Sequence, residues 1–259
     1  MLRGLYTAWT GMVNEQKRLD VISNNMANAD TVGYKEDKVS SQAFEQVLGI
    51  KIRDGSQAYH NQAIGRLSLG VKIGEVYTSY DQGSLRETGG TFDVALSGKG
   101  FFTVSVTDRT GETHTRYTRN GQFMLTKEGL LVDADGNPIQ GEGGDIYINP
   151  SARSVSISPD GMITADGQVI DTLRIVDFED YDYLKKYGNT MYEPVAGATQ
   201  QEAEVEVIQG YTEQSNVQAV SEMVNLITIT RAYEANQRVL RSFDSMLERS
   251  VNQVGRLQS

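Results

Sequence analysis

The chain has 259 residues and a formal net charge of −10, which is long enough for one large domain or two smaller ones with a real core. It contains no cysteine, which excludes disulfides, thiol catalysis and cysteine-ligated zinc. Its two histidines, His60 and His114, lie in separate polar stretches and offer little to a transition metal. The sequence therefore predicts no metal, no cofactor and no enzymatic activity.

The charge is unevenly distributed along the chain. Residues 1–35 and residues 215–259 each carry a net charge of +1, which leaves 15 basic and 27 acidic residues between them. An acidic middle argues against nucleic acid as a partner, because nucleic acid requires clustered Lys and Arg. No segment approaches the roughly 20 apolar residues of a membrane span, and the N-terminus lacks the apolar core of a signal peptide.

The first 35 residues have the pattern of an amphipathic helix that ends in an asparagine-rich segment. Asparagine and glycine end helices because they bond locally and tolerate positive φ. Asn24, Asn25, Asn28 and Gly33 are therefore predicted to shape the helix exit rather than to bind a ligand. The helix itself has residues at alternating spacings of three and four, the a/d spacing of a coiled coil. This series comprises Leu2, Leu5, Trp9, Met12, Gln16, Leu19, Ser23 and Met26.

The middle of the chain is predicted to be mostly antiparallel β structure. A short helix is expected over 36–48, followed by an extended ribbon with a turn at Asp54-Gly55. Beyond residue 76, short alternating apolar runs are separated by turn signals such as Asn-Gly and Asp-Gly. The run from Asp133 to Asn137 looks like a calcium loop, but Gly144 stands where an EF-hand has its bidentate Glu, so a hairpin turn is the better interpretation.

The C-terminal 45 residues repeat the helical pattern of the N-terminus. Spacings of four and three recur in the series Leu226, Thr230, Tyr233, Gln237, Leu240, Asp244, Leu247, Val251 and Val254, and no Pro or Gly interrupts residues 217–254. The two stripes could form an intramolecular helix pair, but they are too wide to bury each other, which favours packing between subunits. The predicted subunit-interface residues are Leu5, Trp9, Met12, Leu19, Met26, Leu226, Ile227, Tyr233, Leu240, Phe243, Leu247 and Val251.

These patterns predict an α+β fold with three parts. Residues 1–35 and 215–259 are expected to form a coiled-coil-like helical assembly domain, residues 36–75 and 198–214 a connecting β ribbon, and residues 76–197 an outer antiparallel β domain. An extracellular β-rich glycan-binding protein or hydrolase is the alternative from a different functional class. It is disfavoured because the catalytic inventory is poor.

Several motifs resemble those of bacterial flagellar rod and hook proteins, and the resemblance covers essentially the whole chain in order. They are MLRGLYTA at 1–8, LDVISNNMANADTVGYK at 19–35, DVALSGKGFF at 93–102, YTRNGQF at 117–123, SNV at 215–217, EMVNLI at 222–227 and RAYEAN at 231–236.

This resemblance implies a structural subunit whose terminal helices line a tube and whose β domain lies outside. The chain lacks the extra outer β domain of larger hook proteins, so a subunit of the basal-body rod is favoured and a hook-type protein is the alternative. The implied partners are further copies of the chain, other rod and hook subunits, and the flagellar type III export apparatus. Such export needs no cleaved signal peptide.

Overall fold

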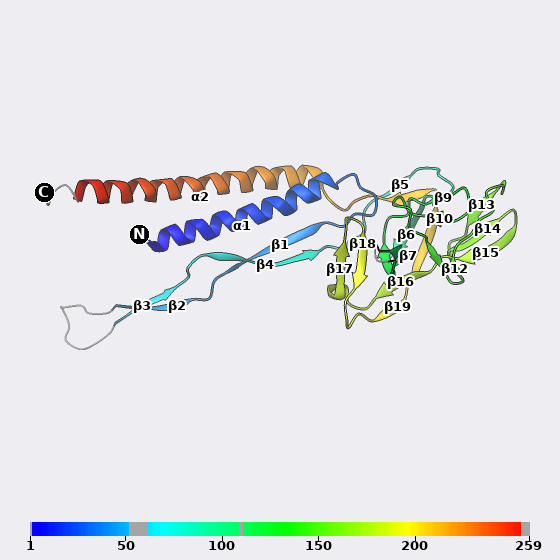
Figure 1. Ribbon diagram of the computed structural model, residues 1–259, viewed down its shortest axis with the longest axis horizontal. Helices are drawn as coiled ribbons and strands as arrows, with labels where there is room; N and C mark the ends of the chain where they lie inside the picture. The colour runs from blue at the N-terminus through cyan, green and yellow to red at the C-terminus, as the bar shows by residue number, and fades with distance from the viewer. Residues whose placement is uncertain (1, 52–61, 109–110, 255–259) are drawn as a thin grey trace. The chain divides into compact units, whose positions relative to one another are not determined.

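The computed structural model describes residues 2–51, 62–108 and 111–254, so the predicted turn at Asp54-Gly55 and His60 lie outside the described residues. It contains an N-terminal helix, a C-terminal helix and a mostly antiparallel β middle, as predicted (Figure 1). The chain divides into two compact units. Unit 1 comprises Met1–Met26, Asp37–Tyr77 and Ala219–Ser259, and unit 2 comprises Ala27–Glu36 and Thr78–Gln218.

Unit 1 is built on an antiparallel helix pair, α1 (Leu2–Ala27) and α2 (Ala219–Val254) (Figure 1). Gly4 of α1 lies directly against the ring of Phe243, where a Cβ would come within 2.6 Å of Cζ. Seven residues further along α1, Gly11 lies against Asn236, which is seven residues earlier in α2. The two glycines therefore let the helix backbones approach closely. Neither described helix is apolar over a length that could cross a membrane.

Each helix turns one face inward and one face outward. The inward positions recur at spacings of three and four, as expected for a helix with one covered face. On α1 they are Leu5, Ala8, Met12, Glu15, Leu19, Ile22 and Met26, and on α2 they are Glu222, Leu226, Ile229, Tyr233, Asn236, Leu240, Phe243 and Leu247, all buried or half-buried.

Two β pairs complete unit 1, and the first of them contacts α1 through the Asn14 side chain, which is hydrogen-bonded to the Ser41 hydroxyl. Strand β1 (Asp37–Ala43) pairs with β4 (Val71–Thr78), and β2 (Val47–Lys51) pairs with β3 (Gln62–Leu67). The helix predicted over 36–48 is therefore wrong. The backbone of this segment bonds to its partner strand instead, and the Ser40 hydroxyl both donates to the Glu75 carbonyl and accepts from the Glu75 amide. Pairing with a distant strand outweighs a weak local helix pattern.

Unit 2 is dominated by a six-stranded sheet of order β17-β18-β8-β7-β16-β19, in which every pairing is antiparallel. Its strands are β7 (Phe101–Thr107), β8 (Thr113–Thr118), β16 (Ile175–Phe178), β17 (Leu184–Tyr187), β18 (Met191–Pro194) and β19 (Gln200–Glu202). The short helix η1 (Tyr181–Tyr183) precedes β17.

Smaller antiparallel pieces surround this sheet. Strand β5 (Leu85–Glu87) pairs with β21 (Tyr211–Glu213), and β6 (Val94–Gly98) pairs with β20 (Val205–Gln209). The rest are the pairs β9 (Met124–Leu125) with β10 (Leu131–Val132) and β11 (Gln140–Gly141) with β12 (Gly144–Asp145), and the three-stranded sheet of β13 (Val155–Ile157), β14 (Met162–Ala165) and β15 (Gln168–Thr172).

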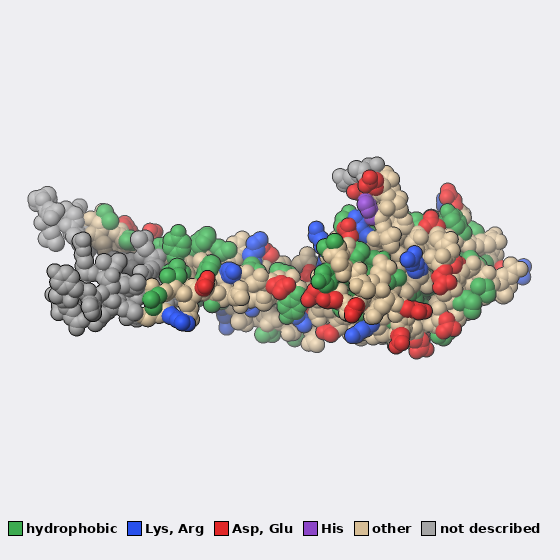
Figure 2. All heavy atoms as spheres, turned by 90° about the horizontal axis from the view of Figure 1, so that it is seen from below, with side chains coloured by type: hydrophobic (Ala, Val, Ile, Leu, Met, Phe, Trp, Pro, Cys, Tyr) green, Lys and Arg blue, Asp and Glu red, His purple; other side chains and the backbone are tan. Residues whose placement is uncertain are grey.

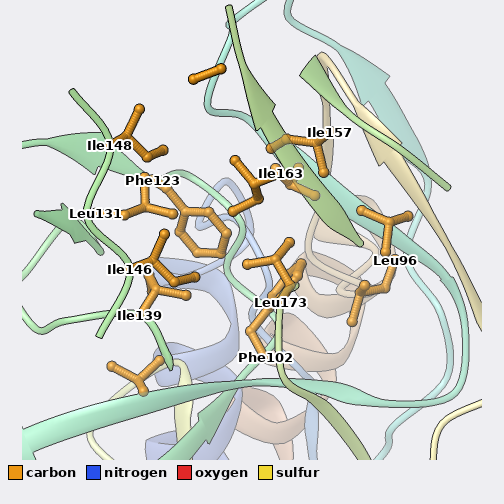
Figure 3. Close-up of a cluster of buried hydrophobic side chains, with 14 residues drawn as sticks. Leu96, Phe102, Phe123, Leu131, Ile139, Ile146, Ile148, Ile157, Ile163 and Leu173 are labelled. Carbon is orange, nitrogen blue, oxygen red and sulfur yellow. The ribbon is translucent and has the colours of Figure 1, made fainter. Parts of the chain in front are cut away.

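Two hydrophobic clusters form the core of unit 2. The larger cluster gathers side chains such as Phe102, Phe123, Leu131 and Ile163 from many of the short strands, and they point toward one another in Figure 3. The second cluster is rich in aromatic residues and includes Phe101, Tyr117, Phe178 and Tyr192. Strands this short cannot be stable alone, so these shared clusters hold them together.

The candidate calcium loop is a hairpin turn, as predicted. One carboxylate oxygen of Asp133 accepts hydrogen bonds from the amides of Asp135 and Asn137, both at 2.9 Å. The side chain of Asp133 thus ties the turn internally, in the manner of an Asx turn. Among the residues that the structure describes, no three His, Cys, Asp or Glu side chains are grouped so that they could hold a metal ion.

Candidate functional site: apolar helix patches and a buried charge cluster

An apolar patch lies on the outward face of α1 near its N-terminus. We call Tyr6, Trp9 and Val13 the α1 patch; they follow the i, i+3, i+7 spacing of one helix face. All three are exposed, and 50% of the Trp9 surface is accessible. The rings of Tyr6 and Trp9 contact edge to face, with centroids 6.4 Å apart. The patch therefore presents a large, partly ordered aromatic surface that unit 1 leaves uncovered.

A second apolar patch lies at the beginning of α2. We call Val220, Met223, Val224 and Ile227 the α2 patch, again one helix face. Val220 is 77% exposed, and Val224 and Ile227 are 59% and 51% exposed. From Arg231 onward the same face carries polar and charged residues, so the patch is confined to the first turns of the helix. Isolated exposed apolar residues are ordinary, but four on one face in two turns require an explanation.

The predicted interface residues divide between the covered and the exposed faces. Trp9, Ile227 and Val251 are exposed, and Val251 shows 72% of its surface. The remaining ones are half-buried on the inward faces of the helix pair: Leu5, Met12, Leu19, Met26, Leu226, Tyr233, Leu240, Phe243 and Leu247. The predicted series thus mixes two faces. Tyr6, Val13, Val220 and Val224 were not predicted, although their spacing in the sequence could have identified them.

The helix exit begins with Asn25, whose buried side chain fastens strand β1 to the end of α1. Its Nδ2 donates to the Asp37 carbonyl at 2.8 Å, and its Oδ1 accepts from the Asp37 amide at 3.1 Å. Nδ2 also lies 3.5 Å from a carboxylate oxygen of Glu222 in the first turn of α2. One amide side chain therefore joins three elements of unit 1. Asn24, the preceding residue, is exposed.

The following residues fold as part of unit 2. Asn28 is buried and its Oδ1 accepts from the Thr31 hydroxyl at 3.3 Å and from Asn189 at 3.1 Å. Gly33 has a φ of +70°, and a Cβ there would lie 2.4 Å from the amide nitrogen of Asn120. Only glycine meets both conditions without strain. Asn25, Asn28 and Gly33 thus hold the backbone through contacts within the protein.

A cluster of buried charges anchors this exit. Lys35, Arg119 and Glu213 are all buried, although they are far apart in the sequence. Lys35 Nζ donates to Glu213 Oε1 at 2.6 Å, and Arg119 Nη1 donates to Glu213 Oε2 at 3.2 Å. The Gly83 amide donates to Glu213 Oε1 at 2.9 Å, and the Gly33 amide donates to the Glu213 carbonyl at 2.8 Å. Glu213 is therefore the centre on which these segments converge.

The cluster has two cations for one carboxylate, so each cation needs further partners. Lys35 Nζ also donates to the Asp81 carbonyl at 2.8 Å, and Arg119 Nη2 donates to the Gly98 carbonyl at 2.6 Å. Burial lowers the pKa of Lys35, an effect that Glu213 opposes. Removing one partner of a buried ion pair typically costs about 3–5 kcal/mol, because the other charge is left uncompensated.

Neutral groups and a second lysine complete this part of unit 2. Asn216 Oδ1 accepts from the Glu36 amide at 2.7 Å, and its Nδ2 donates to the Ser79 and Asp81 carbonyls. Lys186 Nζ donates to the backbone carbonyl of Lys35 at 2.9 Å. Segments 27–36, 78–83 and 213–218, which all continue into unit 1, are thereby bound to one another inside unit 2.

Three family models match the chain in order. The model for the flagella basal body rod protein matches residues 5–35, the model for the flagellar hook protein FlgE/F/G D1 domain matches residues 95–165, and the model for the flagellar basal body rod FlgEFG protein C-terminal region matches residues 208–254. The first and last matches contain the α1 and α2 patches, and the Lys35 and Glu213 positions fall within them as well.

Full-length relatives agree with these matches. The chain is 34% identical to the flagellar basal-body rod protein FlgG of Bacillus subtilis over 271 residues, which covers 97% of this chain and 99% of the relative. It is 31% identical to the flagellar basal-body rod protein FlgF of Caulobacter vibrioides over 259 residues, covering 99% of this chain and all of the relative. The chain therefore belongs to the flagellar basal-body rod protein family, a family of structural proteins and not of enzymes.

Proposed function

We propose that this protein is a structural subunit of the bacterial flagellar basal-body rod, which polymerises helically into the hollow drive shaft between basal body and hook. The observation that carries the proposal is the pair of exposed apolar patches on the terminal helices of a chain with rod-protein relatives. Its partners are further copies of itself and the neighbouring rod and hook subunits of the axis. A subunit of this kind is needed for motility.

Two unlike patches support a contact that propagates. In the antiparallel register that Gly4 and Gly11 define, the α2 patch lies beside the C-terminal half of α1, about 20 Å along the helix pair from Trp9. If the α1 patch of one copy meets the α2 patch of another, the first copy still has a free α2 patch and the second a free α1 patch. Each of these can bind a further copy. Such a heterologous contact builds an open helical array when its rotation does not close a ring.

The same apolar surface accounts for the division of the chain into an inner and an outer part. Residues 1–35 and 215–259 form the assembly domain that lines the tube, with coiled-coil-like packing completed by neighbouring copies. Residues 36–75 brace it. The acidic residues 76–197 form the outer domain, together with residues 198–214, whose strands β19, β20 and β21 pair with strands of unit 2. Acidic side chains are spread over the visible face of unit 2 in Figure 2. An exported chain would order its terminal helices fully on docking, when apolar surface is covered.

A charge placed in the α2 patch tests the proposal. Ile227→Asp leaves the inward face of α2 untouched, so the dilute subunit should keep its circular dichroism spectrum and its unfolding midpoint. In the polymer the new carboxylate would be buried without a partner. A strain carrying only this variant should therefore lose swimming, and electron microscopy should show basal bodies with truncated rods.

Ser242→Asp is the matched control, because Ser242 is exposed on the outward face of the same helix, beyond the α2 patch. It adds the same charge and should leave rods of normal length. A swimming Ile227→Asp strain with normal rods would contradict the proposal, and equal loss with Ser242→Asp would contradict the assignment to this patch. Leu240→Asp is a less specific test, because Leu240 is half-buried in the helix pair and its loss would also disturb the subunit.

A further inference from the structure

The buried charge cluster joins parts of the chain that are made at very different times. Lys35 and Glu213 are separated by 178 residues, and Arg119 lies about midway between them. Chains are synthesised from the N-terminus, so the exit segment 27–36 exists long before its anchor. The two hydrophobic clusters of unit 2 are built from apolar side chains. The buried charges are therefore not part of that core and need a separate explanation.

We propose that Lys35, Arg119 and Glu213 form a helix-exit latch, which fixes the segment after α1 only once strand β21 has been added to unit 2. The latch thereby couples the ordering of the segments that lead into α1 and α2. A chain whose C-terminal part is not yet in place would leave the α1 exit unattached. The order of folding does not depend on the proposed function, although its use in assembly does.

The charges make the latch close in one step. Without Glu213, Lys35 and Arg119 would be two buried cations facing each other across the site, and neither could be desolvated at acceptable cost. With Glu213 present, its carboxylate accepts from both cations and from the Gly83 amide. A partly formed latch is therefore less stable than an open one, which is the condition for cooperative closure.

The backbone follows the same arrangement. The Gly33 amide donates to the Glu213 carbonyl, and the Glu36 amide donates to Asn216 Oδ1, so both ends of the exit are held by residues of the 211–216 segment. The exit also has bonds of its own: the Thr31 amide donates to the Asn28 carbonyl at 3.1 Å, and the Tyr34 amide donates to the Thr31 carbonyl at 3.3 Å. These two local bonds are the reporters that distinguish a latch from a turn that forms independently.

Pulse-labelling hydrogen exchange during refolding of the dilute full-length protein tests the order. We expect the amides of β7 and β8 to become protected first. The Thr31 and Tyr34 amides should then gain protection in the same kinetic phase as the amides of 211–213, although their own hydrogen bonds are local. Protection of Thr31 and Tyr34 together with β7 and β8, ahead of 211–213, would overturn the proposal.

Native-state hydrogen exchange of Glu213→Gln provides the second arm, with Glu206→Gln as control because Glu206 is exposed on β20, the strand that precedes β21 in the sequence. Glu213→Gln should accelerate amide exchange at Thr31 and Tyr34 at least tenfold and leave the exchange rates of β7 and β8 unchanged. Glu206→Gln should leave all of these rates unchanged. Unchanged exchange at the exit, or equal acceleration of exit and sheet, would show that the cluster is no latch. Asn216→Ala, which creates no uncompensated buried charge, should give a smaller acceleration confined to the same segment and keeps the test valid if Glu213→Gln fails to fold.

Discussion

The two units of this chain place similar residues in opposite environments. Unit 2 buries Phe102 completely and even encloses Lys35 and Glu213, whereas unit 1 leaves Trp9 and Ile227 half exposed. Unit 2 therefore encloses both apolar and charged side chains, although Tyr147 and Val169 of the same unit are 59% and 61% exposed. Unit 1 satisfies only the inward faces of its helices. We propose from this difference that the α1 and α2 patches belong to a contact that one chain cannot complete.

The largest expected effect on the free energy of unfolding comes from truncating an aromatic residue in unit 2, and the same truncation in unit 1 is its comparison. Phe102→Ala removes a ring from the larger cluster of unit 2 and should lower the free energy of unfolding by about 3–5 kcal/mol. Trp9→Ala removes a half-exposed ring and should change the stability of the dilute subunit by less than about 1 kcal/mol. Denaturant unfolding followed by circular dichroism measures both.

The effect of Trp9→Ala on rod assembly sharpens the comparison, because this variant should impair assembly although it hardly changes the stability of the subunit. Trp9→Ala should shorten or abolish rods despite a stable subunit, because the α1 patch loses its largest side chain. A Trp9→Ala subunit that is strongly destabilised as a monomer would show that Trp9 belongs to the interior of unit 1. The contrast between self-contained and incomplete units would then fail.

A glycine substitution at the helix exit should have an intermediate effect. Gly33→Ala forces a left-handed φ on alanine and drives its Cβ against the backbone of Asn120, so the expected cost is about 2–5 kcal/mol. Gly136→Ala is the control: Gly136 has a φ of +87° but no atom within 4 Å of the added Cβ. It should cost only about 1 kcal/mol. Equal losses of unfolding free energy would mean that Gly33 is not packed against the rest of unit 2.

The smallest expected effect concerns how the stability of unit 2 depends on pH. Burial raises the pKa of Tyr181, and its hydrogen bond to Asp177, 2.7 Å long, raises the pKa further. The folded state therefore holds the phenol proton more tightly than the unfolded state. This contribution to stability is complete below about pH 10 and is lost as the pH rises above it.

Tyr181→Phe should remove part of this alkaline loss and should cost about 1 kcal/mol at neutral pH through the missing hydrogen bond. Some pH dependence should remain, because burial also raises the pKa of Tyr117. Unfolding free energies measured from pH 8 to pH 11 give the comparison. If the variant and the wild type lose stability in parallel over that range, the assignment to Tyr181 is wrong.

The sequence was sufficient to predict the kinds of elements but not their contacts. Spacing identified both helices and the turns of the β middle, because those signals are local. It could not choose between Ala8, which is buried, and Trp9, which is exposed, since adjacent helix positions differ by only about 100°. That choice depends on where α2 and the ribbon lie against α1.

The helix-exit latch could not have been predicted from one sequence. Lys35 ends the motif that marked the helix exit and Arg119 lies in the motif at 117–123, whereas Glu213 lies in no motif, and nothing local indicated that these three side chains are buried together. A buried charge is energetically sensible only when its partner is known, and the partners here come from three distant segments. The β structure predicted within 198–214 is present as β19, β20 and β21, whereas the strands that pair with it could not be predicted.

The two edges of the six-stranded sheet have a consequence for the life of the free subunit. Strand β19 is three residues long and ends in Glu202, and strand β17 is four residues long and carries Lys185 and Lys186. Short, charged edges discourage the addition of a strand from another molecule. Addition of a strand from another molecule to this sheet is thereby disfavoured, which would leave the proposed association to side chains on the helices.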